Sequence, residues 1–175
     1  MEPDDHSLES LPEPKAMAPD KIDSWLRRAA MAYLTRYASS SANLEKVLVR
    51  KARRRGIEVD SVRLEPVIAS AIRSGLLDDE AYAAAKTASL RRQGRSSMAV
   101  RARLGAKGLG RSAVEVALAG DMTDEQAVEL FARRKRLGRY RIDQTDETRR
   151  RDLAALARAG FSYGLARRIF EEKED

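Results

Sequence analysis

The chain of 175 residues has no cysteine, one histidine and few aromatic side chains. Without cysteine there is no disulfide framework, no thiol nucleophile and no thiolate ligand for zinc. The only histidine, His6, lies in an acidic, proline-containing stretch at the amino terminus. These shortages exclude the His-assisted nucleophiles and the His/Cys metal sites of many enzymes. We expect a reducing, cytoplasmic environment.

Long apolar runs are also missing. No stretch of more than eight residues passes without a charged side chain, whereas a transmembrane helix needs about 20 predominantly apolar residues. The amino-terminal residues have neither the basic nor the apolar segment of a secretory signal. We therefore expect no membrane segment. Residues 1–21 are predicted to be a disordered acidic tail, because they contain four prolines and no periodic apolar positions.

Helical periodicity is present from residue 22 on. Apolar residues recur at three- and four-residue spacing, with no alternating strand pattern. Ser40, Ser96 and Ser162 are candidate N-caps, and the stretches around them match at offsets of 56 and 66 residues. Thr123 with Gln126, and Ser112 with Glu115, fit capping boxes. A helix pair with one apolar face must bury it on a neighbour, so the sequence predicts a short row of small helical bundles.

Negative charge is absent from one long stretch. No Asp or Glu lies between Glu80 and Glu115, although residues 81–120 hold eight Lys or Arg and the net charge of the chain is +7. Since nothing nearby in sequence neutralises these cations, we expect an acidic or polyanionic partner to do so. The predicted partner- or DNA-binding basic patch comprises Arg91, Arg92, Arg95, Arg101, Arg103, Lys107 and Arg111. The second basic run, 130–141, is interpreted as a solvated helix face, because residues 121–175 nearly balance their charges.

Two kinds of partner stay open at this point, a phosphate backbone and an acidic protein surface. None of the nine aromatic residues lies between Tyr82 and Phe131, so the basic patch has no platform for base stacking. The candidate recognition helix, residues 97–107, contains neither Asn nor Gln, the common readers of adenine. An autonomous nucleic-acid-binding protein built on helix–turn–helix pairs is the alternative hypothesis.

Catalytic signals are weak. Asp78, Asp79 and Glu80 could bind a metal ion, but an Asp at a helix N-cap with acids in the first turn is the more ordinary arrangement. The segment GAKGLGRS at 105–112 superficially resembles a phosphate-binding loop, yet its residue order is wrong and no strand precedes it. We predict a protein that is not an enzyme, with no catalytic residue, cofactor, metal site or small-molecule substrate.

Four segments together resemble the RecX family of recombinase regulators in its alphaproteobacterial form. In chain order they are YLTRYASSSANLEKVLVRKARRRGI (33–57), GLLDDEAYA (75–83), GRSSMAVRARLGAKGL (94–109) and LARAGFSYGLARRIF (156–170). The resemblance implies an all-α fold, an elongated, curved array of three tandem three-helix repeats, which we place at residues 22–77, 78–121 and 122–175.

The resemblance also implies a function. Members of the family bind the RecA recombinase filament on DNA and inhibit its assembly, ATP hydrolysis and strand exchange without any chemistry of their own. They thereby modulate recombination, DNA repair and the SOS response, and direct DNA contact is a further implication. On this reading the basic patch faces the groove of the filament.

Overall fold

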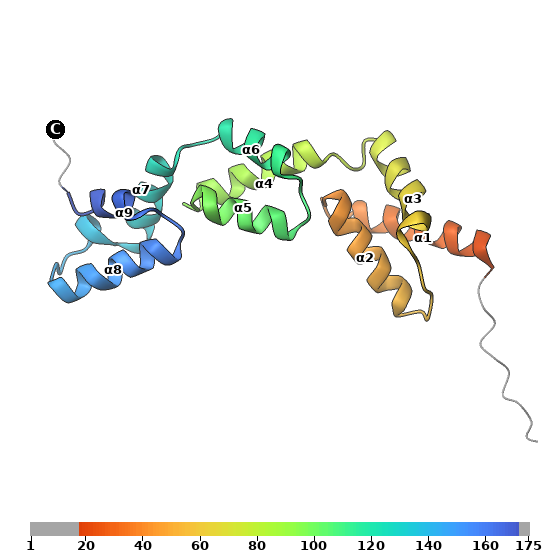
Figure 1. Ribbon diagram of the computed structural model, residues 1–175, viewed down its shortest axis with the longest axis horizontal. Coiled ribbons are helices and arrows are strands. Elements are labelled where there is room, and N and C mark those ends of the chain that lie inside the picture. Colours follow the sequence, from red (N-terminus) through yellow and green to blue (C-terminus); the bar gives the residue numbers. More distant parts are fainter. Residues whose placement is uncertain (1–17, 172–175) are drawn as a thin grey trace, which may run out of the picture.

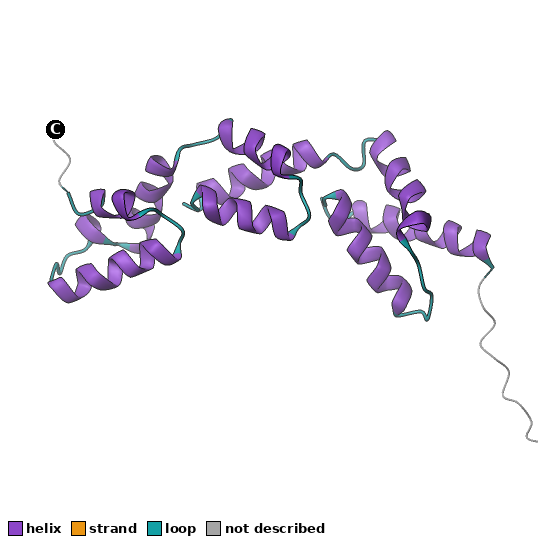
Figure 2. Cartoon of the chain, viewed as in Figure 1, coloured by secondary structure: helices purple, strands orange, loops and turns teal. Residues whose placement is uncertain are grey.

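The structure, a computed structural model, describes residues 18–171, and the regular elements of this part are all helical (Figures 1 and 2). The predicted all-α class is therefore confirmed. The predicted tail falls mainly on residues 1–17, which lie outside the described residues. Among residues 18–171, no helix has the length and apolar character that crossing a membrane requires.

The helices follow one another with short connections. They are α1 Pro19–Leu34, α2 Ser41–Arg53, α3 Ser61–Arg73, α4 Asp79–Arg92, α5 Ser97–Ala106, α6 Arg111–Ala119, α7 Asp124–Lys135, the 3-10 turn η1 Gly138–Tyr140, α8 Asp146–Arg158 and α9 Tyr163–Arg168. The predicted end of the tail is wrong, because α1 already begins at Pro19. Proline suits the first helical turn, where its missing N–H has no partner in any case.

Three separate apolar cores divide the helices into three groups. The first is centred on Leu26, Leu44 and Leu64 of α1, α2 and α3, and the second on Leu90, Val100 and Val114 of α4, α5 and α6. The third is centred on Val128 of α7, Leu156 of α8 and Ile169, which follows α9. Figure 1 shows the groups side by side in an arched row, with α2, α5 and α8 along its lower edge. The interpretation of these groups as three repeats with the boundaries given above stays a prediction.

Local signals place the helix starts correctly in most cases. The hydroxyl oxygens of Ser40, Ser96 and Ser162 each accept a hydrogen bond from a backbone N–H in the first turn, as predicted. The capping box of Thr123 and Gln126 is also present. The second predicted capping box is wrong, because α6 begins after Gly110 without a side-chain cap.

The three groups meet at two junctions that use the same pair of hydrogen bonds. At the first junction the Ser40 hydroxyl donates to the carbonyl of Lys107 (2.6 Å), and the N–H of Ser41 donates to Asp79 (2.8 Å). At the second junction the Ser96 hydroxyl donates to the carbonyl of Ala159 (2.8 Å), and the N–H of Ser97 donates to Asp124 (2.8 Å). The two capping serines therefore act twice, within a helix and between groups.

Two glycines permit this close approach. Gly108 and Gly160 follow α5 and α8 with φ of +78° and +88°, a region that favours glycine. A Cβ on Gly108 would lie 2.4 Å from the Cβ of Ala42, and one on Gly160 would lie 2.5 Å from the Ser96 hydroxyl. Any larger residue would push the junctions apart.

Candidate partner-binding surface

Arg91, the first member of the predicted basic patch, is a structural residue. Its side chain is 1% exposed, and it forms an ion pair with Asp124. Its Nε donates to the carbonyl of Met122 (3.0 Å) and its Nη1 to that of Arg95 (2.9 Å). The prediction that Arg91 meets a partner is wrong, because its donors are already used inside the chain.

Arg101 is neutralised as well. It forms a bidentate pair with Glu115, with Nε–Oε1 and Nη2–Oε2 distances of 2.7 and 2.9 Å. The hydrogen bond from Arg101 lowers the pKa of the Glu115 carboxyl. The expectation that no carboxylate of the chain neutralises the patch is thus wrong for Arg91 and Arg101.

The other members of the patch make no ion pair within residues 18–171. Arg92, Arg103, Lys107 and Arg111 are exposed, whereas Arg95 is partly buried. Their contact with a partner stays a prediction. The structure places Arg95 in the lining of an open groove.

The backbone fixes the place of Arg95 between the second and third groups. Gly94 has φ +72°, and a Cβ on it would lie 2.8 Å from the backbone nitrogen of Phe131 in α7. On the other side Ser96 is anchored to the end of α8 through the carbonyl of Ala159. The α4–α5 turn therefore lies against both helices, and Arg91 holds it there by donating to the Arg95 carbonyl.

The Arg95 side chain lines an open groove of about 540 Å³, together with residues of α7, α8 and the segment after α7. Four cations and an apolar floor make up most of its walls, and none of the acidic residues within 18–171 lines it. The Nε of Arg95 is buried and has no hydrogen-bond partner among residues 18–171. The cations are Arg95, Arg134, Lys135 and Arg158, and the floor consists of Phe131, Leu137, Ala155 and Ala159. We call this site the basic groove.

The first junction serves as an internal comparison. Ser40 and Ser96 take the same place in the two junctions. Arg95 directly precedes Ser96, and the residue that directly precedes Ser40 is the buried Ser39. The carbonyls of Lys107 and Ala159 accept the serine hydrogen bonds of the two junctions. Arg158 directly precedes Ala159, and the residue that directly precedes Lys107 is Ala106. The same junction contacts thus form without these cations, so the architecture of the junction does not require the charge of the basic groove.

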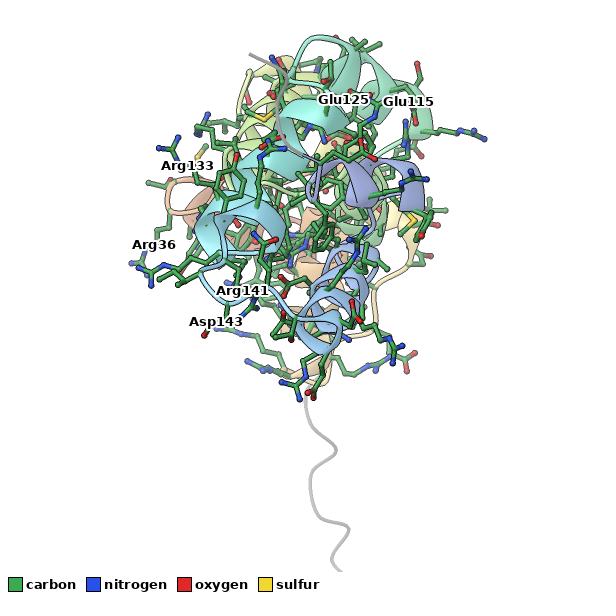
Figure 3. The ribbon with its side chains drawn as sticks, turned by 90° about the vertical axis from the view of Figure 1, so that its left-hand side faces the viewer. Arg36, Glu115, Glu125, Arg133, Arg141 and Asp143 are labelled. Atoms are coloured by element: carbon green, nitrogen blue, oxygen red, sulfur yellow. The ribbon has the colours of Figure 1, made fainter. Side chains whose placement is uncertain are left out.

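Charged side chains of the three groups can be compared around the long axis. In the view along this axis (Figure 3), Arg36 at the end of α1 and Arg133 of α7 project to one side. Asp143 lies toward that side as well, whereas Glu115 and Glu125 lie in the upper right of the view. Cations of the first and third groups therefore share a side of the row, although these groups are far apart in the sequence.

Sequence reasoning missed the groove residues Arg134, Lys135 and Arg158. Residues 121–175 balance their charge in number but not in space, because acids begin α7 and α8 while cations end them. Of the run 130–141, Arg141 pairs with the buried Asp152 (2.7 Å) and Arg139 with Glu129. Counting the charges of helix starts and helix ends separately is the signal that could have identified the remaining cations.

The acidic cluster before α4 has a structural role. The Asp78 carboxylate accepts from the N–H of Ala81 (2.9 Å) as the N-cap, which confirms the predicted cap. Asp79 binds Ser41 at the first junction. Residues 18–171 contain no group of three or more His, Asp or Glu side chains arranged to hold a metal ion.

The fold and the groove together define an all-α protein, a row of small helical bundles with an open, cation-lined groove. No family model matches the chain. Regulatory protein RecX of Myxococcus xanthus, however, is 37% identical over 182 residues, which cover 97% of this chain and 94% of the relative. Regulatory protein RecX of Agrobacterium fabrum is 30% identical over 173 residues, covering 93% and 94%. The chain belongs to the RecX family of regulatory proteins.

Solved structures share the fold. The crystal structure of RecX from Lactobacillus salivarius superposes with a TM-score of 0.68 at 22% identity, covering 86% of this chain and 95% of the other. A second crystal structure of regulatory protein RecX gives a TM-score of 0.68 at 23% identity, covering 88% and 74%. The family resemblance carried by the four sequence segments is confirmed.

Proposed function

We propose that this chain is a non-enzymatic regulator that binds the RecA recombinase filament on DNA and restrains it. It inhibits filament assembly, ATP hydrolysis and strand exchange, and so modulates recombination, DNA repair and the SOS response. Membership of the RecX family supports the choice of partner. The observation that carries the mode of binding is the basic groove, a set of cations that the junction itself does not need.

The shape of the molecule supports a mechanism. An arched row of three helix groups can contact neighbouring subunits of a filament at the same time (Figure 1). Contacts linked in one rigid chain act together, because the second contact forms at high effective concentration. Bridged subunits cannot exchange or undergo the motion that turnover requires.

Two sets of cations have different parts in this proposal. The exposed Arg92, Arg103, Lys107 and Arg111 supply long-range attraction, which raises the rate of association. The groove cations make the short, charge-assisted hydrogen bonds that determine how long the complex lasts. A direct contact with DNA phosphates by the exposed set is part of the same proposal.

The alternative, an autonomous nucleic-acid-binding protein, is less well supported. A recognition helix presents the residues of its first turn to the bases. In α5 this end is occupied, because Ser96 and Ser97 are bonded to Ala159 and Asp124 of the third group. The helix start that would have to enter a major groove is thus part of a junction.

The test is to add the full chain to RecA filaments on single-stranded DNA and to follow ATP hydrolysis and strand exchange. We expect inhibition at near-stoichiometric amounts. In parallel, binding to single- and double-stranded DNA is measured without the recombinase at physiological salt. Unchanged hydrolysis and exchange would contradict the proposal, and tight, recombinase-independent DNA binding would favour the alternative.

A further inference from the structure

We propose that the basic groove binds an acidic peptide segment that carries an apolar side chain. This inference deepens the proposed function and rests on it for the protein that contributes the segment. The groove lies between α7, α8 and the α4–α5 turn, and four of its nine lining residues are cations. Because its lining, as far as the described part of the chain goes, holds no acidic residue, a bound carboxylate meets no like charge from that part.

The chemistry of Arg95 points to a ligand. Its guanidinium makes no ion pair within residues 18–171, although the side chain lines the groove. Arginine forms strong, directional hydrogen bonds with carboxylates. A carboxylate placed between Arg95 and the cations of α7 and α8 can accept hydrogen bonds from the Nη groups of Arg95.

The apolar floor argues for a peptide rather than for a nucleic acid. Leu137 and Ala159 are buried, while Phe131 and Ala155 are partly exposed, so the lining offers apolar contact beside the cations. The Phe131 ring packs on Phe161, with a centroid separation of 5.8 Å, and is not free as a stacking platform. A phosphate backbone would use the cations and leave the floor uncovered, whereas an acidic segment with a Leu or Phe uses both.

The groove is also held in shape before binding. Arg91, Asp124, Ser96 and Gly94 fix the turn that carries Arg95 against α7 and α8. Binding then requires little ordering of the protein, which favours affinity for a short segment.

The test uses labelled probes and fluorescence anisotropy at 0.15 M salt with the full chain. The probes are a peptide of Asp and Glu with one central Phe, the same peptide with Ser in place of Phe, and oligo-dT. One variant removes three groove cations (Arg134→Gln, Lys135→Gln, Arg158→Gln). A matched control removes three exposed cations outside the groove (Arg28→Gln, Arg73→Gln, Arg150→Gln), and Ala155→Glu places a carboxylate on the floor. Circular dichroism verifies the fold of each variant.

We expect the Phe peptide to bind and the Ser peptide to bind about tenfold more weakly, in line with the loss of a buried aromatic side chain. The groove variant and Ala155→Glu should each lose about tenfold or more in affinity, whereas the control should change less than about twofold. Equal losses in the groove and control variants, equal binding of both peptides, or groove-dependent binding of oligo-dT alone would overturn the inference.

Two further arms separate the alternatives. If deletion of residues 1–17 raised the peptide affinity about tenfold, the acidic amino-terminal segment of the chain itself would be the occupant, and the assignment to a partner would fail. If the peptide did not bind but the full chain still inhibited the recombinase, the inference would fail and the proposed function would stand. If the peptide bound but the full chain did not inhibit the recombinase, the proposed function would fail and the assignment of the groove to an acidic peptide would stand.

Discussion

Arg91 and Arg92 are neighbours of the same residue type with opposite environments. Arg91 is buried and Arg92 is exposed. The difference follows from the helix period, because Arg91 continues the buried stripe of Ala83, Thr87 and Leu90 on α4, while Arg92 is turned about 100° away. Charge counting along the sequence cannot distinguish the two, and the alanines spread around α4 leave no clear apolar stripe from which to predict the difference.

Replacing Arg91 should destabilise the protein. In Arg91→Met, Asp124 loses its ion-pair partner and the carbonyls of Met122 and Arg95 lose their donor, so we expect a loss of about 3 kcal/mol in the free energy of unfolding. Arg92→Met should change it by less than about 0.5 kcal/mol. Urea unfolding of both variants checks this, and similar values for the two would contradict the structural role of Arg91.

Asp124 links the second junction to pH. Partial burial raises the pKa of its carboxyl, but hydrogen bonds from Arg91 and from the N–H and hydroxyl of Ser97 outweigh the burial, so the pKa lies below its ordinary value. The folded state therefore binds this proton more weakly than the unfolded chain does. Its contribution is complete above the ordinary Asp pKa of about 4 and is lost as pH falls through the lower folded value.

The corresponding prediction is a change in acid sensitivity. Asp124→Asn should be less stable than the wild type at pH 7, and its stability should fall less steeply below about pH 4. Urea unfolding over a series of pH values measures both slopes. Parallel slopes would show that Asp124 does not contribute to the acid sensitivity.

At the scale of elements, the three capping serines are alike in sequence but not in structure. Ser40, Ser96 and Ser162 all cap helices, and only Ser40 and Ser96 also donate across a junction. The caps could be predicted because a capping residue and the helix it begins are adjacent in the chain. The junctions could not, because each joins residues 27 to 67 positions apart.

Because Ser96 acts both as a cap and across a junction, its loss should lower the free energy of unfolding more than the loss of a cap alone. Ser96→Ala removes a cap and also leaves the carbonyl of Ala159 without its donor, so we expect a loss of about 2–3 kcal/mol in unfolding free energy. Ser162→Ala removes only a cap and should cost about 1 kcal/mol. Thermal unfolding of the two variants side by side decides the point, and equal losses would contradict the junction contact.

The basic groove shows the same limit of sequence reasoning. Its cations come from a turn and two helices, and a junction between the second and third groups brings them together. The all-α class and most helix starts follow from local periodicity and caps. The groove could not be predicted, because Arg95, Arg134 and Arg158 look like unrelated members of separate basic runs until the junction is known.

At the scale of the whole molecule, net charge and the groove act on different steps of binding. Removing three exposed cations of the predicted patch (Arg92→Gln, Arg103→Gln, Arg111→Gln) should slow association with the recombinase filament severalfold at low salt. The effect should fade as salt rises toward about 0.3 M, because screening removes long-range attraction. Stopped-flow association at several salt concentrations tests this, and an effect that persists at high salt would assign these residues to short contacts instead.

The most direct test of the account compares inhibition of recombinase ATP hydrolysis by two variants of equal net charge. One carries Arg134→Gln, Lys135→Gln and Arg158→Gln in the basic groove, and the other carries Arg28→Gln, Arg73→Gln and Arg150→Gln outside it. The account predicts that the groove variant keeps its helical content but needs about tenfold or more protein for half-maximal inhibition, while the second variant inhibits nearly as the wild type does. Equal inhibition by the two variants would contradict it.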